Sequence, residues 1–173
     1  YDRGQDKAYM SLFKAFAEDN TEHAADIGII GATPLDMPDL NCGSYLMNLL
    51  HEWGYNDPAC YGMGSGLTEI KNAGSALCNL VVSPSRLKTA RWLKDRFGTP
   101  YVTGFPITDT DSSLRIKIKD AIEGKPQHKT SCAEAYSSNN QHLLIIHQQV
   151  MANSLREYIC KKYACSGIDV ATW

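Results

Sequence analysis

The residues that could take part in chemistry lie in short segments rich in glycine and hydroxyl groups. In the segment YGMGSGLTEI, residues 61–70, Gly62, Gly64 and Gly66 occupy every second position, and Ser65 lies between the last two. Glycine allows backbone N–H groups to approach a ligand closely, and the start of a helix favours negative charge. The spacing matches neither the GxGxxG dinucleotide pattern nor the P-loop, which ends in Gly-Lys-Ser/Thr. The segment therefore predicts the wall of a larger cofactor pocket or a tight turn, rather than a nucleotide phosphate site.

Two further segments of this kind follow apolar runs. GATPLD contains Gly31 and Thr33, and SPSR contains Ser83, Ser85 and Arg86. In an open parallel sheet, ligands bind beyond the carboxyl ends of the strands, so these segments are candidates for one cofactor-binding edge. The guanidinium of Arg86 suits an acidic group on a cofactor or substrate, with a solvated surface side chain as the alternative. For each segment taken singly, ordinary turn and capping residues are the plainer explanation.

No nucleophile–base pair and no metal-ligand spacing stands out, so the catalytic residues are unknown and no metal site is predicted. The five histidines are scattered, and His147 follows a strand pattern at a possible pocket edge. Helix capping explains the loop acids Asp36, Asp39, Asp109 and Asp111 as well as catalysis does. The six cysteines include no CxxC pair, and the core pattern of the chain favours free thiols over a disulfide framework.

Composition and charge exclude several classes of protein. The chain carries 17 basic and 19 acidic residues, a net charge of −2, which argues against a nucleic-acid-binding protein. No apolar run approaches the roughly 20 residues that a membrane helix needs. The sequence opens on Tyr1 rather than Met and stops inside a strand pattern, so we expect a piece of a longer, cytoplasmic protein.

Short apolar runs alternate with amphipathic stretches along most of the chain. Strands are predicted in residues 26–31, 57–64, 77–83 and 99–107, and helices in residues 8–18, 43–54, 66–74, 84–98 and 109–124. Ser44 is the predicted N-cap of the second helix, and Gly54 and Gly98 are predicted to end helices. Such alternation is typical of an α/β fold, here a Rossmann-like three-layer sandwich with a mostly parallel sheet and helices on both faces.

Four segments, taken in order, resemble the nitrogenase component 1 type oxidoreductase family. They are GIIGATPLDM, YGMGSGLTEIKNAGSALCNLVVSPS, TARWLKDRFGTPYVTGFPI and LLIIHQQVMANSLRE. That family includes the α and β subunits of the nitrogenase molybdenum–iron protein, their cofactor-assembly scaffolds and related reductases that act on tetrapyrroles. The resemblance implies a subunit of three Rossmann-like domains, in which Gly62 to Gly66 line a central cavity for a metallocluster or a tetrapyrrole.

The resemblance and the sequence pattern together suggest domain boundaries. Residues 1–25 are expected to end a preceding domain, and residues 26–124 to form the Rossmann-like middle domain. Residues 125–140, KPQHKTSCAEAYSSNN, lose the pattern and are predicted to be a linker or a mobile loop. Residues 141–173 begin a new βα unit, which either completes the first sheet or starts the next domain.

The sequence departs from the nitrogenase pattern at the cluster site. Nitrogenase α subunits place a cluster-binding cysteine where this chain has Val82 or Ser83. A serine hydroxyl is a poor iron ligand beside thiolates. The remaining cluster ligands of the family would lie before Tyr1 and after Trp173. We therefore expect no cofactor in the isolated fragment, whereas the full-length parent could still hold an iron–sulfur cluster or another metallocofactor.

The resemblance implies a domain of a nitrogenase-like oxidoreductase subunit that contributes a wall of a cavity for a metallocluster, a tetrapyrrole or a substrate. The parent would receive electrons from an ATP-dependent iron–sulfur reductase protein and associate with a second component 1-like subunit. Catalysis by the fragment alone is not expected. Two alternatives stay open: a non-catalytic scaffold that binds a metallocofactor or tetrapyrrole during assembly, and a small-molecule sensor domain.

Overall fold

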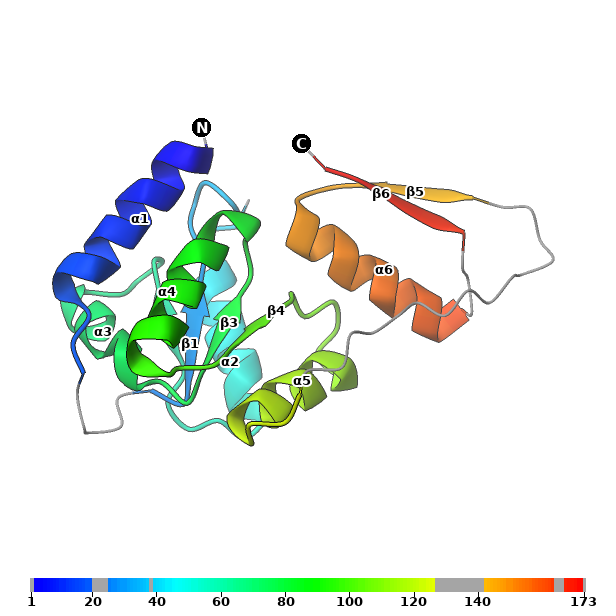
Figure 1. The fold of residues 1–173 in the computed structure, drawn as a ribbon. Helices are drawn as coiled ribbons and strands as arrows, with labels where there is room; N and C mark the ends of the chain where they lie inside the picture. Colours follow the sequence, from blue (N-terminus) through cyan, green and yellow to red (C-terminus); the bar gives the residue numbers. More distant parts are fainter. Residues whose placement is uncertain (1, 20–24, 38, 127–141, 164–166, 173) are drawn as a thin grey trace.

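The main part of the fold is a four-stranded parallel sheet. The computed structural model describes residues 2–19, 25–37, 39–126, 142–163 and 167–172 (Figure 1). The strands of this sheet are β1 (Ile27–Ile30), β2 (Ala59–Tyr61), β3 (Cys78–Val81) and β4 (Tyr101–Thr103). They lie in the order β2-β1-β3-β4, and every neighbouring pair is parallel. Both central strands, IGII and CNLV, are buried along their whole length, as expected for a parallel sheet covered on both faces.

Helices cover both faces of this sheet. One face carries α1 (Asp2–Phe16), α3 (Leu67–Lys71) and α4 (Leu87–Phe97), and the other carries α2 (Cys42–Glu52) and α5 (Ser112–Ile122) (Figure 1). On the first face Phe13 and Leu93 pack with Ile30 in one buried apolar cluster. On the second face Leu50 and Ile118 belong to the cluster that contains the other sheet residues. The predicted α/β three-layer architecture, with helices on both faces, is confirmed.

The ends of the helices follow local hydrogen bonding more closely than residue type. The predicted N-cap, Ser44, is wrong, because α2 begins at Cys42 and its N-cap is Asn41. The Asn41 N–H donates to the Asp39 carboxylate at 2.8 Å, so the chain has already turned into the helix two residues before Ser44. Gly54 and Gly98 follow the helices as predicted, with φ values of +96° and +79°.

The last elements form a separate small unit. Strands β5 (Leu143–Ile146) and β6 (Ile168–Ala171) form a two-stranded parallel sheet of their own, joined through α6 (Gln149–Tyr163). The sequence left open whether residues 141–173 complete the first sheet or start a new domain. Among the described residues, β5 and β6 pair with each other and not with the four-stranded sheet. The proposed linker, residues 125–140, lies outside the described residues except at its first two positions.

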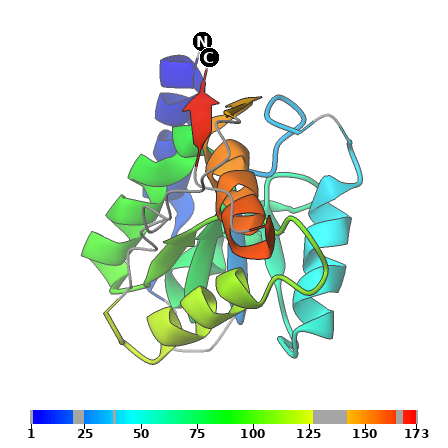
Figure 2. The ribbon, with the colours of Figure 1, turned by 90° about the vertical axis from the view of Figure 1, so that its right-hand side faces the viewer.

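Helix α6 connects this unit to the rest of the molecule. It lies between α5 and the β5–β6 pair, as two perpendicular views show (Figures 1 and 2). The Gln148 side-chain amide donates to the Val82 carbonyl at 2.9 Å, and the Phe105 N–H donates to the Ser154 hydroxyl at 2.9 Å. The start of α6 therefore sits beside the carboxyl ends of β3 and β4. Within the described parts of the chain, no helix has the length and apolarity needed to cross a membrane.

Candidate functional site

The loops after β1 and β3 meet in a polar cluster at the carboxyl edge of the sheet. The Thr33 hydroxyl donates to one oxygen of the Asp36 carboxylate at 2.8 Å, and the Ser83 hydroxyl donates to the other at 3.2 Å. The hydroxyls of Ser83 and Ser85 lie 2.9 Å apart. Together with Arg86, these residues are called the Asp36 cluster below. The structure thus brings together four residues that the sequence selected separately, and places Asp36 at their centre.

Arg86 is the most constrained member of this cluster. Its side chain is only 3% exposed, so the alternative of a solvated arginine is wrong. One terminal nitrogen lies 3.5 Å from the Asp36 carboxylate and donates to the Gln5 side chain at 3.1 Å. The guanidinium carbon lies 4.7 Å from the centre of the Tyr9 ring, within the range of a cation–π contact. The other two nitrogens, Nε and Nη1, are buried and have no hydrogen-bond partner.

Two glycines allow the loops to approach each other this closely. At Gly31, where φ is +100°, an added Cβ would lie 2.8 Å from the Ser83 Cβ and 3.0 Å from the Arg86 Cγ. At Gly62 an added Cβ would lie 2.6 Å from the Ala32 carbonyl oxygen. The glycine-rich turn after β2 therefore packs directly against the loop after β1. Both positions leave no room for a side chain without a shift of the neighbouring backbone or side chains.

The glycine-rich turn satisfies part of its own hydrogen bonding. The Ser65 hydroxyl accepts from the Gly62 N–H at 3.0 Å, and the Glu69 carboxylate accepts from the Gly66 N–H at 2.8 Å. Gly64, with φ of +76°, has open space where a Cβ would be. Of the eight residues selected from the sequence, Gly64 and Ser65 lie in this turn and form no hydrogen bond with the Asp36 cluster in the described part of the chain. Two of the turn's N–H groups are therefore already bonded within the turn.

Helix α1 supplies site contacts that sequence reasoning missed. Gln5 and Tyr9 lie on α1 and contact Arg86, and the Tyr9 hydroxyl donates to the Tyr61 carbonyl at the end of β2. Burial is the main cause that raises the pKa of Tyr9, so its hydroxyl stays protonated as a donor. The sequence carries no local signal for these contacts, because α1 precedes the sheet by many residues and reads as an ordinary amphipathic helix. Asp36 did carry a signal, as an acid in a strand–helix loop.

Cysteines and histidines do not converge on this edge. Desolvation raises the pKa of Cys60 to about 11 and that of Cys78 to about 12, so both are protonated thiols at neutral pH. His147 is exposed at the end of β5 and its Nδ1 accepts from the Gln148 N–H at 2.8 Å. In the described residues, no three side chains of His, Cys, Asp or Glu come together in a way that could hold a metal ion. His23, His128, Cys132 and Cys165 lie outside the described residues.

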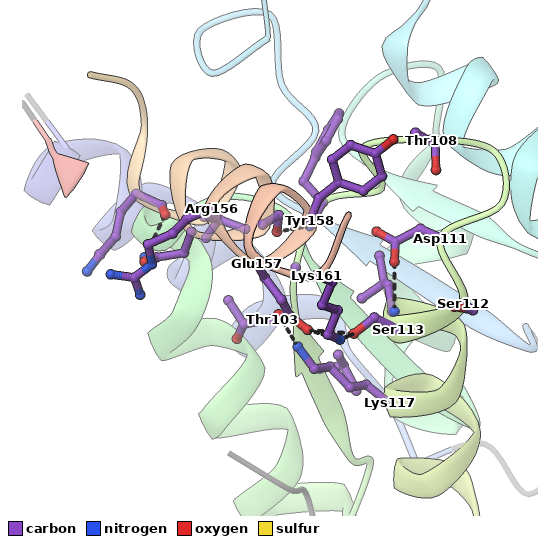
Figure 3. A pocket seen from close by; sticks show the side chains of 18 of the residues that line it. Thr103, Thr108, Asp111, Ser112, Ser113, Lys117, Arg156, Glu157, Tyr158 and Lys161 are labelled. Carbon is purple, nitrogen blue, oxygen red and sulfur yellow. Dashed lines mark hydrogen bonds and ion pairs between the residues drawn. The ribbon is translucent and has the colours of Figure 1, made fainter. Parts of the chain in front are cut away.

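A second feature is a cavity of about 830 Å³ between α5 and α6 (Figure 3). One wall is formed by the end of β4 and the first turns of α5, and the other by α6. Across it, the Glu157 carboxylate of α6 accepts from Lys117 at 2.6 Å and from Lys161 at 2.8 Å, and also from the Ser113 hydroxyl. None of the eight residues selected from the sequence lines this cavity. No periodic or motif signal in the sequence points to this cavity, since its walls come from elements about 40 residues apart.

A comparison with known protein families matches the larger part of the chain. The model of a family described as nitrogenase component 1 type oxidoreductase matches residues 1–117, which is more than half of the 173 residues. The matched region contains the four-stranded sheet, α1 and the whole Asp36 cluster. No curated protein matches the chain significantly.

Proposed function

Because the chain belongs to the nitrogenase component 1 type oxidoreductase family, we propose that it forms one wall of a cofactor or substrate cavity in a nitrogenase-like oxidoreductase subunit. Residues 26–124 are the wall-forming domain in this proposal, and residues 1–25 and 141–173 belong to the neighbouring parts of the subunit. The match over residues 1–117 is the observation that carries it. The parent subunit would receive electrons from an ATP-dependent iron–sulfur reductase protein and associate with a second component 1-like subunit.

The family implies a metallocluster, but the donor atoms at this edge do not fit one. Iron clusters are held by thiolates, whereas Ser83 presents a hydroxyl that is already bonded to Asp36 and Ser85. The buried Cys60 and Cys78 are protonated thiols, because desolvation raises their pKa. In this proposal the described edge therefore forms a wall without supplying cluster ligands, and the fragment alone is not required to catalyse the reaction.

The geometry of the Asp36 cluster supports a wall that faces a polar group. The Arg86 guanidinium is only 3% exposed and contacts Gln5 and Tyr9 of α1, so in this proposal it holds the loops in place rather than contacting the ligand. The neighbouring hydroxyls of Thr33 and Ser85 and the exposed turn at Gly64 and Ser65 would extend the same surface. Gly31 and Gly62 keep the loops close enough for these groups to share one edge.

The cytoplasm is the proposed location. Cys42, Cys60 and Cys78 form no disulfide in the described part of the chain. Free thiols persist where glutathione and thioredoxin keep cysteines reduced. A redox partner that depends on ATP also requires a compartment that contains ATP.

A non-catalytic scaffold is the second candidate, and Val82 and Ser83 favour it. Neither Val82 nor Ser83, the two residues that stand where nitrogenase α subunits place the cluster-binding cysteine, supplies a thiolate, so a metallocofactor or tetrapyrrole would bind during assembly and leave again. The two candidates differ in whether the full-length protein itself carries a redox centre.

Anaerobic purification of the full-length protein tests both candidates. Iron–sulfur absorption that bleaches on addition of the ATP-dependent reductase and ATP would support the oxidoreductase. A colourless protein that takes up a tetrapyrrole or an isolated metallocofactor with defined stoichiometry would support the scaffold. A colourless protein that binds neither and accepts no electrons would contradict both, leaving the sensor domain.

A further inference from the structure

The cavity between α5 and α6 has the size of a small-molecule site and is open to solvent on one side. Its volume, about 830 Å³, falls within the range of roughly 300–1,000 Å³ typical of ligand pockets. It lies on the β4 side of the sheet, with Thr103 and Gly104 at its floor and α6 along its far wall. Figure 3 shows Lys117, Lys161 and Glu157 grouped at its centre, with Arg156 and Asp111 on either side.

The lining of the cavity is more cationic than the chain as a whole. Four cationic side chains line it, namely Lys117, Arg156, Lys161 and Lys162. Only two carboxylates do, those of Asp111 and Glu157. The whole chain carries a net charge of −2, so this excess of positive charge is local. A local excess of positive charge in a hollow of the surface attracts anions.

The two carboxylates do not cancel the excess. Glu157 accepts from both Lys117 and Lys161, so one negative charge faces two positive ones. Asp111 is the N-cap of α5 and accepts from the Leu114 N–H at 3.2 Å, so its charge is directed at the helix start.

Arg156 and Lys162 supply the rest of the excess. Neither forms an ion pair with a carboxylate in the part of the chain that the structure describes. The Nε of Arg156 is buried and has no hydrogen-bond partner. Lys162 contacts the Tyr158 hydroxyl at 2.8 Å, a neutral partner that leaves its charge in place.

We propose that this cavity binds a small polyanion, a molecule bearing two or more phosphate or carboxylate charges. Two unmatched cations on α6 would meet its charges, and the hydroxyls of Thr108 and Ser112 on the opposite wall would donate hydrogen bonds to its oxygens (Figure 3). A cationic ligand would be repelled by the positive excess, and an uncharged one would leave the charges of Arg156 and Lys162 unmatched. The site is separate from the Asp36 cluster and does not depend on the redox function proposed above.

Isothermal titration of the full-length protein with inorganic pyrophosphate and, separately, with citrate tests the proposal. We expect one of the two to bind with 1:1 stoichiometry and a Kd below about 1 mM. The affinity should fall at least tenfold when NaCl is raised from about 0.05 to about 0.5 M, because salt screens charge–charge attraction. The preferred probe distinguishes a phosphate from a carboxylate ligand, and binding of neither overturns the proposal.

Three variants locate the binding. Ser112→Glu places a negative charge at the first position of α5, where an acid stabilises the helix, so the fold should hold while affinity falls at least tenfold. The double variant R156Q/K162Q should lose a similar factor. Lys119→Gln is the matched control, because Lys119 lies on α5 but does not line the cavity. Binding that survives Ser112→Glu in a protein with an unchanged melting temperature would contradict the assignment.

Discussion

The Arg86 guanidinium has more hydrogen-bonding capacity than its surroundings use. Its shortest approach to the Asp36 carboxylate is 3.5 Å, and only one of its three nitrogens has a hydrogen-bond partner. A buried ion pair of this kind contributes little net stability, because desolvation offsets much of the attraction. Removing one partner is different, since the remaining charge is then buried alone. Asp36 therefore stabilises the fold mainly by offsetting the cost of burying the charge of Arg86.

Substitutions at Asp36 and Arg86 should therefore lower the free energy of unfolding by unequal amounts. Asp36→Asn should lower the free energy of unfolding by about 3 kcal/mol, because it leaves the Arg86 charge without a carboxylate. In the double variant with Arg86→Met the charge is gone, so most of that loss should be recovered. Urea denaturation of the two single variants and the double variant measures the coupling. Additive effects would show that the pair is not coupled as the structure indicates.

Gly31 and Gly54 form a matched pair for a second prediction. Their φ values are almost the same, +100° and +96°, so alanine meets similar backbone strain at both, about 1 kcal/mol or more. Only at Gly31 would the added Cβ also collide, with Ser83 at 2.8 Å, whereas nothing lies within 4 Å at Gly54. Gly31→Ala should therefore be the more destabilising by at least about 1 kcal/mol in urea denaturation. Equal losses would mean that the two loops separate easily.

At the residue scale, sequence reasoning selected members of the site but not its centre. Thr33, Ser83 and Arg86 were selected because small and polar residues after strands gather at one sheet edge. Asp36 was explained by helix capping, and its role as the shared acceptor depends on a partner 47 positions away. Tyr9 could not be selected, because its contacts to Arg86 and Tyr61 exist only once α1 packs on the sheet.

At the scale of elements, the Glu157 carboxylate of α6 is the main acceptor in the polar contact between α5 and α6, and Lys161 also donates to the Ser113 hydroxyl. Burial raises the pKa of Glu157, but the hydrogen bonds from Lys117, Lys161 and Ser113 outweigh it and lower the pKa from 4.5 to about 2. A carboxylate with a lowered folded-state pKa stabilises the fold fully above its unfolded value. That contribution is lost as the pH falls from about 4.5 towards 2. The contact between the two helices should therefore weaken in acid.

The third prediction follows from the lowered pKa of Glu157. The difference in unfolding free energy between the wild type and Glu157→Gln should be largest above pH 4.5 and should shrink as the pH falls to about 2. Denaturation curves at a series of pH values measure it. The unfolding free energy of Lys117→Gln should also change less with pH between 4.5 and 2 than that of the wild type. This substitution removes one of the donors that lower the pKa of Glu157. A difference that is independent of pH would contradict the network.

The order and type of the elements followed from the sequence, whereas their ends did not in every case. The predicted helix over residues 84–98 is present, but its first turn, Pro84–Arg86, is a 3₁₀ turn and α4 begins at Leu87. Proline fits a first turn because it has no N–H to satisfy. The N-cap of α2 at Asn41 depended on a hydrogen bond to Asp39 that residue preferences alone did not select over Ser44.

At the scale of the whole molecule, the alternation of strands and helices was enough to predict a parallel sheet covered on both faces. It did not predict which strands pair, because β1 lies between β2 and β3 through contacts between distant residues. The same limit left the place of residues 141–173 open. The pattern of β5 and β6 is that of any buried strand, and only the observed pairing separates them from the larger sheet.

The separate pairing of β5 and β6 has a consequence for stability across the molecule. A two-stranded sheet is marginal by itself, and this one has a small core in which Ile145, Ala152 and Ile168 are buried. On β5, Leu144 and Ile146 remain 57% and 62% exposed, whereas the strands β1 and β3 are buried throughout. Local opening should therefore need much less free energy in the small unit than in the four-stranded sheet.

Hydrogen exchange measures this difference directly. The backbone amides of β5 and β6 should exchange at least about 100-fold faster than those of β1 and β3 at the same pH, because few apolar contacts must break to expose them. The amides of α6 should lie between the two, since Gln148, Ser154 and Glu157 tie this segment to the larger part. Glu157→Gln should speed exchange in α6 and leave β1 and β3 unchanged. Equal protection in both sheets would instead mean that the two units open as one cooperative body.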